Sequence, residues 1–268
     1  MDLALIKKLL DINLSVQAPD VLLFESIDST NAEALRQLKG AQFSRSSEIS
    51  KVLIANFQTA GRGRRGRVWI SPKDAGLYFS VIKKFELSPS CLQGLSLLIG
   101  LAVCQVVRRF GVDNAQLKWP NDILVESAKL AGILLEMYQS KGNCYVVLGI
   151  GLNLCLEHGD SKQINREVTD LSQLLGVFPQ KELILVALIE EIENRLNVFS
   201  VEGFAAFQHE WNSLDEFLGR QVKVESGLET LAEGISRGVD ASGALLVDTD
   251  GGEKRILGGE LSPSLVLL

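Results

Sequence analysis

The spacing of apolar residues predicts alternating helices and strands along most of the chain. Residues 3, 6, 9 and 10 recur at helical spacing and predict one short amphipathic helix within 1–18. Short apolar runs predict strands at 21–24, 52–58 and 76–83, and residues 94–110, apolar nearly all round, predict a buried helix. Further strands are expected at 115–119, 122–126, 131–138 and 145–154, before two long helices near 181–199 and 201–212. Since strict βαβ alternation is missing, the pattern predicts an α+β fold whose sheet is covered by helices on one face.

The pattern changes near residue 215. Short β-rich runs at 221–224, 232–237, 244–247 and 254–257 are separated by Ser-Gly and Gly-Gly turn signals, which predicts a small barrel or sandwich. Residues 216–268 carry five Lys/Arg against nine Asp/Glu, which argues against a nucleic-acid module. We therefore expect an N-terminal extension (1–20), a catalytic domain (21–215) and a C-terminal β-domain (216–268).

Composition excludes several classes of protein. The 268 residues are 46% hydrophobic and 22% charged, with a formal net charge of -6, as in ordinary soluble proteins. No apolar run reaches the ~18 residues of a membrane helix, and lysines follow rather than precede the N-terminal apolar stretch, the wrong order for a secretory signal. Neither the cysteines (91, 104, 144, 155) nor the histidines (158, 209) have metal-ligand spacing. We expect a cytoplasmic protein with free thiols and no zinc.

Residues 61–67, Gly-Arg-Gly-Arg-Arg-Gly-Arg, form a dense basic segment in an acidic chain. Glycine allows tight turns and close approach to a ligand, and arginine donors fit carboxylate or phosphate. The three glycines also match a dinucleotide fingerprint, but the proline within 68–72 argues against the helix that this fingerprint needs. No Walker A Gly-Lys-Ser/Thr follows. From the loop alone, an anion clamp, a nucleic-acid patch and a solvated loop all stay open.

Three other polar clusters accompany this loop. Ser29-Thr30-Asn31, after Asp28, predicts a helix cap and can equally form a polar wall for a neutral ligand head. A tight corner between strands is predicted for Lys118-Trp119-Pro120-Asn121-Asp122. The corner is either purely structural or binds phosphate and Mg²⁺ through its lysine and aspartate. In Lys129-Leu130-Ala131-Gly132, one charged residue enters an apolar strand; an isolated lysine of this kind usually faces solvent.

Taken in order, these segments strongly resemble biotin–protein ligases. The resemblance is carried by residues 28–31, 58–69, 118–122, 129–134 and 149–153, and runs from about 21 to 262. It implies a class II synthetase-like catalytic domain, with a central mixed β-sheet and helices, and a small C-terminal SH3-like β-barrel. It also implies synthesis of biotinyl-5′-AMP from biotin and ATP, then transfer of biotin to one lysine of the biotin carboxyl carrier protein of acetyl-CoA carboxylase or a related carboxylase.

The resemblance further implies the roles of individual residues. Biotin and its adenylate would be bound by Ser29, Thr30, Asn31, Gln58, Gly61, Arg62, Gly63, Arg64, Trp69, Lys129 and Gly132. ATP would be bound by Arg64, Arg67, Trp69, Lys118, Asn121 and Asn153. Arg62, Arg64, Lys118 and Lys129 would act in catalysis, and Asp122 and Asn153 would lie near Mg²⁺.

Alternative functions are weighed against this resemblance. A lipoate–protein ligase is the strongest rival, although the loop and the C-terminal β-domain favour biotin. A carrier protein is excluded because Met-Lys-Met is absent; the methionines are Met1 and Met137. Only about 20 residues precede the first expected strand, too few for a helix-turn-helix domain, so we expect no DNA binding. We also expect no membrane association, and an exposed sheet edge would allow a homodimer.

Overall fold

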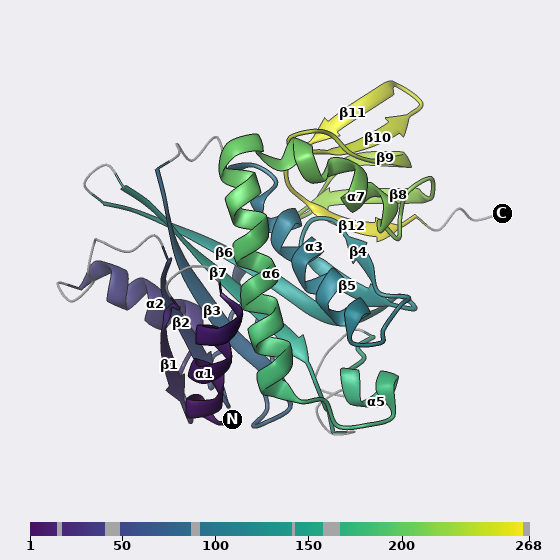
Figure 1. Cartoon of the computed structure of the whole chain (residues 1–268). Helices are drawn as coiled ribbons and strands as arrows, with labels where there is room; N and C mark the ends of the chain where they lie inside the picture. Colours follow the sequence, from purple (N-terminus) through teal and green to yellow (C-terminus); the bar gives the residue numbers. More distant parts are fainter. Residues whose placement is uncertain (15–17, 41–48, 87–91, 141–142, 158–166, 265–268) are drawn as a thin grey trace.

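The computed structural model describes residues 1–14, 18–40, 49–86, 92–140, 143–157 and 167–264. A central seven-stranded sheet has the strand order β1-β2-β3-β7-β6-β5-β4, and a smaller five-stranded sheet has the order β11-β10-β9-β8-β12. Figure 1 shows the smaller sheet at one end of the larger one. The central sheet is mixed, because β1 pairs with β2 in parallel and the other neighbours are antiparallel. The predicted α+β class is confirmed.

The strands of the two sheets follow the apolar runs of the sequence closely. The central strands are β1 (Asp20–Phe24), β2 (Ile49–Ala55), β3 (Gly76–Phe85), β4 (Gln116–Lys118), β5 (Asp122–Val125), β6 (Ala128–Ser140) and β7 (Asn143–Asn153). The C-terminal strands are β8 (Gln221–Ser226), β9 (Glu229–Val239), β10 (Leu245–Thr249), β11 (Gly252–Ile256) and β12 (Glu260–Pro263). The last strand was not predicted, because its four residues carry little periodicity and it forms by pairing with β8. The antiparallel C-terminal sheet is consistent with the predicted SH3-like barrel.

The helices depart from the sequence prediction in two places. They are α1 (Leu3–Asn13), α2 (Thr30–Lys39), α3 (Leu95–Arg109), α5 (Leu171–Leu175), α6 (Lys181–Glu202) and α7 (Gln208–Ser213), with 3-10 turns η1 (Arg64–Gly66) and η3 (Phe204–Phe207). The short α5 was not expected, and the second long helix expected near 201–212 is wrong. Gly203, at a φ of 68°, ends α6, and the chain continues as η3 and the short α7.

Helices cover both faces of the central sheet, not one face as predicted. The large hydrophobic core joins α1, α3 and α6 to one face, which we call the core face. On the opposite face, which we call the site face, α2 packs on a small apolar cluster that includes Leu53, Ile82 and Val147. Figure 1 shows α6 crossing the front of the sheet while α2 lies behind it. The sequence pattern concealed this because α2 is short and covers only part of its face.

A buried ion pair interrupts the apolar core face. Lys83 on β3 lies 3.1 Å from Glu193 on α6, and their side chains are only 8% and 9% exposed. Because a charge buried without a partner is costly, each member of such a pair depends strongly on the other. The pair therefore fixes α6 against β3 at one point on the core face.

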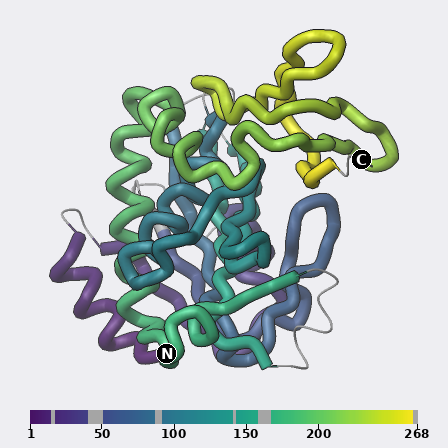
Figure 2. The backbone as a smooth tube through the Cα atoms, turned by 90° about the vertical axis from the view of Figure 1, so that its right-hand side faces the viewer, coloured from purple at the N-terminus to yellow at the C-terminus, as the bar shows by residue number. Residues whose placement is uncertain are grey.

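Hydrogen bonds from side chains to the backbone attach the C-terminal sheet to the part of the chain that holds the central sheet. Asn212 on α7 accepts from the amide of Val239 at 2.8 Å and donates to its carbonyl at 3.1 Å. Trp119 Nε1 donates to the carbonyl of Gly243 at 3.2 Å. At the junction itself, burial raises the pKa of Asp215 to about 6. Figure 2 shows the two parts in contact along this seam.

The remaining sequence expectations concern free thiols, metal binding and membrane-spanning helices. Cys104 and Cys144 are buried free thiols and Cys155 is a partly buried one, whereas Cys91 and His158 lie outside the described residues. Within the described ranges, no group of three or more His, Cys, Asp or Glu side chains could hold a metal ion. In the same ranges, no helix is long and apolar enough to cross a bilayer.

Candidate active site

Three glycines leave the site face bare at the centre of the sheet. Gly132 on β6 pairs with Gly151 on β7, and Gly149 lies two residues away on the same face of β7. A Cβ atom on Gly151 would lie 2.5 Å from the Trp69 ring, and one on Gly149 would lie 2.2 Å from Asn31 Oδ1. Glycine is thus required where Trp69 and Asn31 lie directly on the strands. A cavity of about 570 Å³ opens over this surface.

One end of the cavity is built from neutral hydrogen-bonding groups at the start of α2. Ser29 caps the helix, with its Oγ accepting from the amide of Ala32 at 3.4 Å, as the sequence predicts. Gln58 Oε1 accepts from the amide of Thr30 at 2.9 Å, and Ser80 Oγ donates to Asn31 Oδ1 at 2.6 Å. Ser29, Thr30 and Asn31 are each under 5% exposed. The cap and the polar wall are therefore the same structure.

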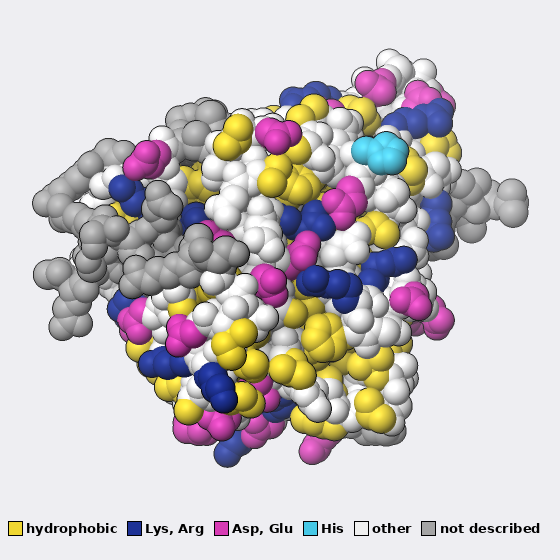
Figure 3. All heavy atoms as spheres, viewed as in Figure 1, with side chains coloured by type: hydrophobic (Ala, Val, Ile, Leu, Met, Phe, Trp, Pro, Cys, Tyr) yellow, Lys and Arg dark blue, Asp and Glu magenta, His cyan; other side chains and the backbone are white. Residues whose placement is uncertain are grey.

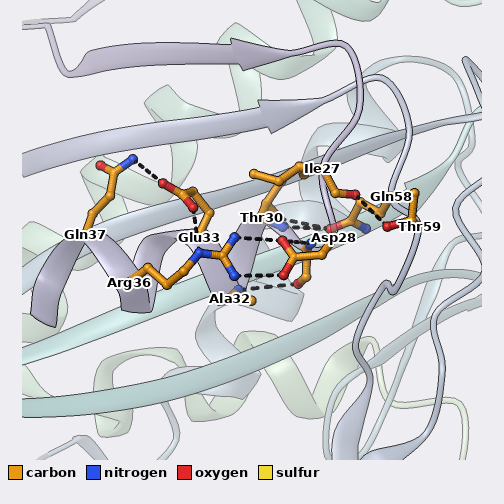
Figure 4. A network of polar contacts seen from close by, with 10 residues as sticks. Ile27, Asp28, Thr30, Ala32, Glu33, Arg36, Gln37, Gln58 and Thr59 are labelled. Carbon is orange, nitrogen blue, oxygen red and sulfur yellow. Dashed lines mark hydrogen bonds and ion pairs between the residues drawn. The ribbon is translucent and has the colours of Figure 1, made fainter. Parts of the chain in front are cut away.

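A surface ion pair anchors the turn that precedes these residues. Arg36 donates to both oxygens of Asp28 at 2.7 Å, and Asp28 Oδ1 also accepts from the amide of Ser29 at 2.7 Å (Figure 4). The hydrogen bonds from Arg36 lower the pKa of Asp28 to about 2. The carbonyl of Asp28 accepts from the amide of Ala60. The turn that holds Ser29 is thus tied to the segment that leads into the arginine loop.

The arginine loop is a structured hairpin rather than a solvated segment. Arg62 and Val68 form an antiparallel bridge, and the amide of Trp69 donates to the carbonyl of Gly61 at 2.9 Å. At the tip, Arg65 and Gly66 adopt positive φ values of 55° and 75°. A Cβ on Gly61 would lie 2.2 Å from the carbonyl oxygen of Trp69, so glycine permits the two strands of the hairpin to approach. No α-helix follows the loop, as the sequence predicted.

The four arginines of the loop point to three different places. Arg62 NH2 lies 2.9 Å from Glu136 on β6, and Arg64 donates to Asn121 Oδ1 at 3.1 Å. Arg65 and Arg67 turn to the C-terminal sheet, where both face Glu260 on β12. Burial lowers the pKa of Arg64. The C-terminal sheet thus holds the outer side of the loop, which Figure 2 shows reaching toward it.

The opposite end of the cavity is cationic. Lys118 ends β4 and Asp122 begins β5, and the two are register partners across the tight corner that the sequence predicts. Lys129 is only 5% exposed, contrary to the usual behaviour of an isolated lysine. Its ammonium group pairs with Asp122 and lies 5.1 Å from the centre of the Trp69 ring. Lys118, Lys129 and Arg64 therefore line this end of the cavity, and Asp122 pairs with Lys129.

The cavity collects nearly all of the site residues predicted from sequence. Gly61 alone does not line it and instead permits the hairpin turn. Asn153 lines it with its side-chain nitrogen directed to the carbonyls of Lys129 and Thr169. The other predicted residues in the lining are Ser29, Thr30, Asn31, Gln58, Arg62, Gly63, Arg64, Arg67, Trp69, Lys118, Asn121, Asp122, Lys129 and Gly132.

Sequence reasoning missed several residues of this site. Gly149 and Gly151 lie in the lining, and their alternation with large apolar residues in one strand was the available signal. Ser80 and Glu136 contact lining residues from strand positions whose parity places them on the site face. Glu260 and Leu261 come from the C-terminal sheet, and no local pattern could have brought them here.

Known proteins similar to this chain belong to one family of ligases. A model of the biotin/lipoate A/B protein ligase family matches residues 23–153, and a model of the biotin protein ligase C-terminal domain matches residues 217–262. The chain is 38% identical to the bifunctional ligase/repressor BirA of Escherichia coli over 88% of this chain and 71% of that protein. It is 32% identical to the biotin–[acetyl-CoA-carboxylase] ligase of Paracoccus denitrificans over 87% of this chain and 96% of that one.

Solved structures of biotin protein ligases resemble this fold. A biotin protein ligase from Aquifex aeolicus, in complex with biotin and ATP, superposes with a TM-score of 0.76 at 30% identity. The match covers 91% of this chain and 99% of that one. The likeness therefore extends over both sheets.

Proposed function

Because the chain belongs to the biotin protein ligase family, we propose that it joins biotin to protein in two steps. It activates biotin with ATP to form biotinyl-5′-AMP, then transfers biotin to one lysine of the biotin carboxyl carrier protein of acetyl-CoA carboxylase or a related carboxylase. The observation that carries this proposal is a single cavity with a neutral hydrogen-bonding end and a cationic end. Biotin has the same polarity, with a neutral ureido ring and a carboxylate tail.

The neutral end suits the ureido ring. Hydroxyl and amide groups on Ser29, Thr30 and Gln58 offer both donors and acceptors, as a ureido group requires. Asn31 and Arg62 also belong to this end, and both contact the carboxylate of Glu136. Gly132 and Gly149 keep this end low, because Asn31 lies directly on Gly149 and leaves room above the strands for the bicyclic ring. Gly63 and Trp69 would enclose the ligand from the loop side.

The cationic end suits the reacting groups. Arg64, Lys118 and Lys129 can neutralise charge where the biotin carboxylate meets the α-phosphate of ATP. Trp69 offers a ring face for the adenine base, and its buried indole nitrogen has no hydrogen-bond partner within the described residues. Arg67, Asn121 and Asn153 would complete the nucleotide site.

The chemistry follows from bringing two anions together. A carboxylate oxygen of biotin attacks the α-phosphorus, the bond to the β-phosphate oxygen breaks, and pyrophosphate leaves. The carrier lysine then attacks the mixed anhydride as a free amine, its nitrogen loses a proton, and AMP departs. Buried cations lower the barrier of the first step by stabilising the developing negative charge. The loop hairpin covers the adenylate and limits its hydrolysis by water.

Magnesium would enter with the nucleotide. Asp122 is the carboxylate at the cationic end, but Lys129 already pairs with it, and Asn153 directs its side-chain nitrogen to backbone carbonyls. Mg²⁺ commonly keeps several waters and binds through one or two carboxylates plus substrate phosphates. Asp122 would hold an ion that arrives as Mg-ATP, and that ion would help to neutralise charge on the phosphates.

A nucleic-acid-binding function finds little support. The arginine loop is engaged by Glu136, Asn121 and Glu260 instead of forming a free basic patch. On the face shown in Figure 3, basic and acidic side chains intermix among the described residues. Absence of operator binding, a possible homodimer, cytoplasmic location and the domain limits at 20 and 215 stay predictions.

One assay tests the proposed function directly. The protein is incubated with biotin, Mg-ATP and the carrier domain of a biotin-dependent carboxylase, and the carrier is weighed by mass spectrometry. The expected result is a carrier heavier by one biotinyl group, with no gain when ATP is omitted. A parallel incubation with lipoate and a lipoyl domain tests the rival ligase. Modification of the lipoyl domain instead would overturn the proposal.

A further inference from the structure

Glu136 contacts two walls of the cavity that come from distant parts of the chain. Its Oε2 accepts from Asn31 Nδ2 at 3.0 Å, at the first turn of α2. Its Oε1 lies 2.9 Å from NH2 of Arg62, at the start of the loop hairpin. The Glu136 side chain is 19% exposed, so both contacts are partly shielded from water. One carboxylate therefore joins α2, β6 and the loop.

The position of Glu136 along β6 places it at the neutral end of the cavity. Residues 132, 134 and 136 share the site face because side chains alternate along a strand. Glu136 lies about 13 Å from Gly132 along the strand, at roughly 3.3 Å per residue. The ammonium group of Lys129 marks the other end, since a Cβ on Gly132 would lie 2.8 Å from it. The Glu136–Arg62 and Asp122–Lys129 ion pairs thus lie at opposite ends.

Arg62 needs a partner for its charge at this end. Its side chain is 46% exposed and lines the cavity beside the uncharged groups of Thr30 and Gln58. A guanidinium without a fixed acceptor adopts many rotamers, and ordering it on ligand binding costs conformational entropy. A carboxylate that accepts one arm leaves the remaining donors directed at the ligand. The same carboxylate fixes the amide of Asn31.

We propose that Glu136 is a positioning residue that holds Asn31 and Arg62 in the arrangement that receives the neutral ring of the ligand. The proposal rests on the proposed function and deepens it. Glu136 neutralises Arg62, so that the ligand carboxylate is attracted only to the end occupied by Arg64, Lys118 and Lys129. Glu136 acts through Asn31 and Arg62, and so should affect ligand affinity more than the chemical step.

The test compares Glu136→Gln with a matched control. Glutamine keeps an oxygen acceptor for Asn31 but removes the negative charge that faces Arg62. Glu191 on α6 has the same 19% exposure and also pairs with arginine, but it lies on the core-face side of the sheet. Glu191→Gln therefore makes the same chemical change away from the cavity. Both variants are compared with the whole wild-type chain by thermal unfolding, biotin titration and single-turnover adenylate formation.

The expected result separates binding from chemistry. Glu136→Gln should raise the biotin Kd and KM about tenfold, while adenylate formation at saturating biotin changes less than about threefold. Glu191→Gln should leave Kd and KM unchanged. In an Arg62→Gln background, Glu136→Gln should raise Kd less than about threefold, because its partner is already gone. Glu136→Ala, which also removes the acceptor for Asn31, should weaken biotin binding further.

Three outcomes would overturn the proposal. The first is an unchanged biotin Kd in Glu136→Gln, and the second is a loss that is the same with and without Arg62. The third is an equal loss in Glu191→Gln, which would assign the effect to fold stability. A wild-type chain that fails to bind biotin defeats the proposed function itself, whereas normal wild-type binding with an unaffected Glu136→Gln defeats only the role of Glu136.

Discussion

The two faces of the central sheet are made by the same strands but have opposite chemistry. On β7, Leu148, Ile150 and Leu152 enter the large core under α3 and α6. Their neighbours Gly149 and Gly151 face the cavity. Because side chains alternate along a strand, large apolar side chains on the core face and glycines on the site face occupy successive positions of β7. The well-packed face therefore supports a stretch of strand without side chains of its own, on which Trp69 and Asn31 lie directly.

Charges follow the same division. On the core face, the partners of the ion pair Lys83–Glu193 are almost fully enclosed. The site face holds Lys129–Asp122 and Arg62–Glu136, which line or adjoin a cavity open to ligands. We infer that the first pair acts on stability alone, whereas the other two act mainly on ligands. This contrast can be broken or sharpened by changing one residue at a time.

The largest expected effect is at the cationic end of the site face. Lys129→Ala should slow adenylate formation on the order of 10³-fold, about 4 kcal/mol, because it removes a buried donor to the reacting groups. Single-turnover formation of radiolabelled adenylate measures this. The unfolding temperature should change far less than the rate. Full activity would remove Lys129 from the site.

The buried pair on the core face should give the converse result. Lys83→Met leaves Glu193 without its partner and should lower the free energy of unfolding by about 3–4 kcal/mol. Urea denaturation followed by circular dichroism measures the loss. The double variant Lys83→Met, Glu193→Leu should recover much of it, since no charge is then left buried. A stable single variant with impaired adenylation would contradict the division between the faces.

Leu148→Ala tests the filled side of β7. This residue is fully buried in the core, and its truncation should lower the free energy of unfolding by about 3 kcal/mol. At a temperature where the variant is folded, its KM for biotin should match that of the wild type. Denaturant titration and steady-state assays provide the two numbers. A change in KM without loss of stability would show that the faces are coupled.

Gly149→Ala makes the matching change on the adjacent residue. Its new methyl group would lie 2.2 Å from Asn31 Oδ1, so Asn31 must move from its place on the strand. We expect biotin affinity to fall about 100-fold, or about 2.7 kcal/mol, because a displacement of about 1 Å in a site can have an effect of that size. Isothermal titration measures the affinity. Normal binding would mean that Asn31 does not contact the ligand.

Asp215 extends the comparison to the seam between the two sheets. Its folded-state pKa of about 6 lies above the ordinary 3.8, so the folded protein binds this proton more tightly than the unfolded chain. Stability from this group is therefore present below pH 4 and is lost as the pH rises to about 6. Asp215→Asn should raise the free energy of unfolding at pH 8 and leave it almost unchanged at pH 4. Thermal unfolding at both pH values measures the difference, and equal effects would contradict the assignment.

Local pattern in the sequence predicted most of the elements, and the resemblance to biotin–protein ligases implied most of the residues that line the cavity. Apolar runs locate the strands, Ser29 caps α2, and Lys118 to Asp122 form the expected corner. The arginine loop signalled anion chemistry because its composition is unusual for this acidic chain. The resemblance to biotin–protein ligases rests on those same segments, and the comparisons confirm the family.

The sequence failed where long-range contacts decide the outcome. Helix α2 covers the second face of the sheet although its local pattern resembles that of any short helix. Strand β12 forms by pairing with β8, and its Glu260 reaches back to the arginine loop. In the sequence, Glu136 is indistinguishable from any polar residue of a strand, because its partners Asn31 and Arg62 are brought to it only by the fold.

The sequence by itself thus determined which chemical groups the protein has, because turn formers, glycines and arginines act through their own backbone and charge. The tertiary structure decided how those groups are used. Lys129 is buried against Asp122, and Trp69 and Asn31 lie directly on glycines of the sheet. The division of the arginine loop between Glu136, Asn121 and Glu260 also depends on segments far apart in the chain. Such pairings depend on distance in space, which local periodicity does not encode.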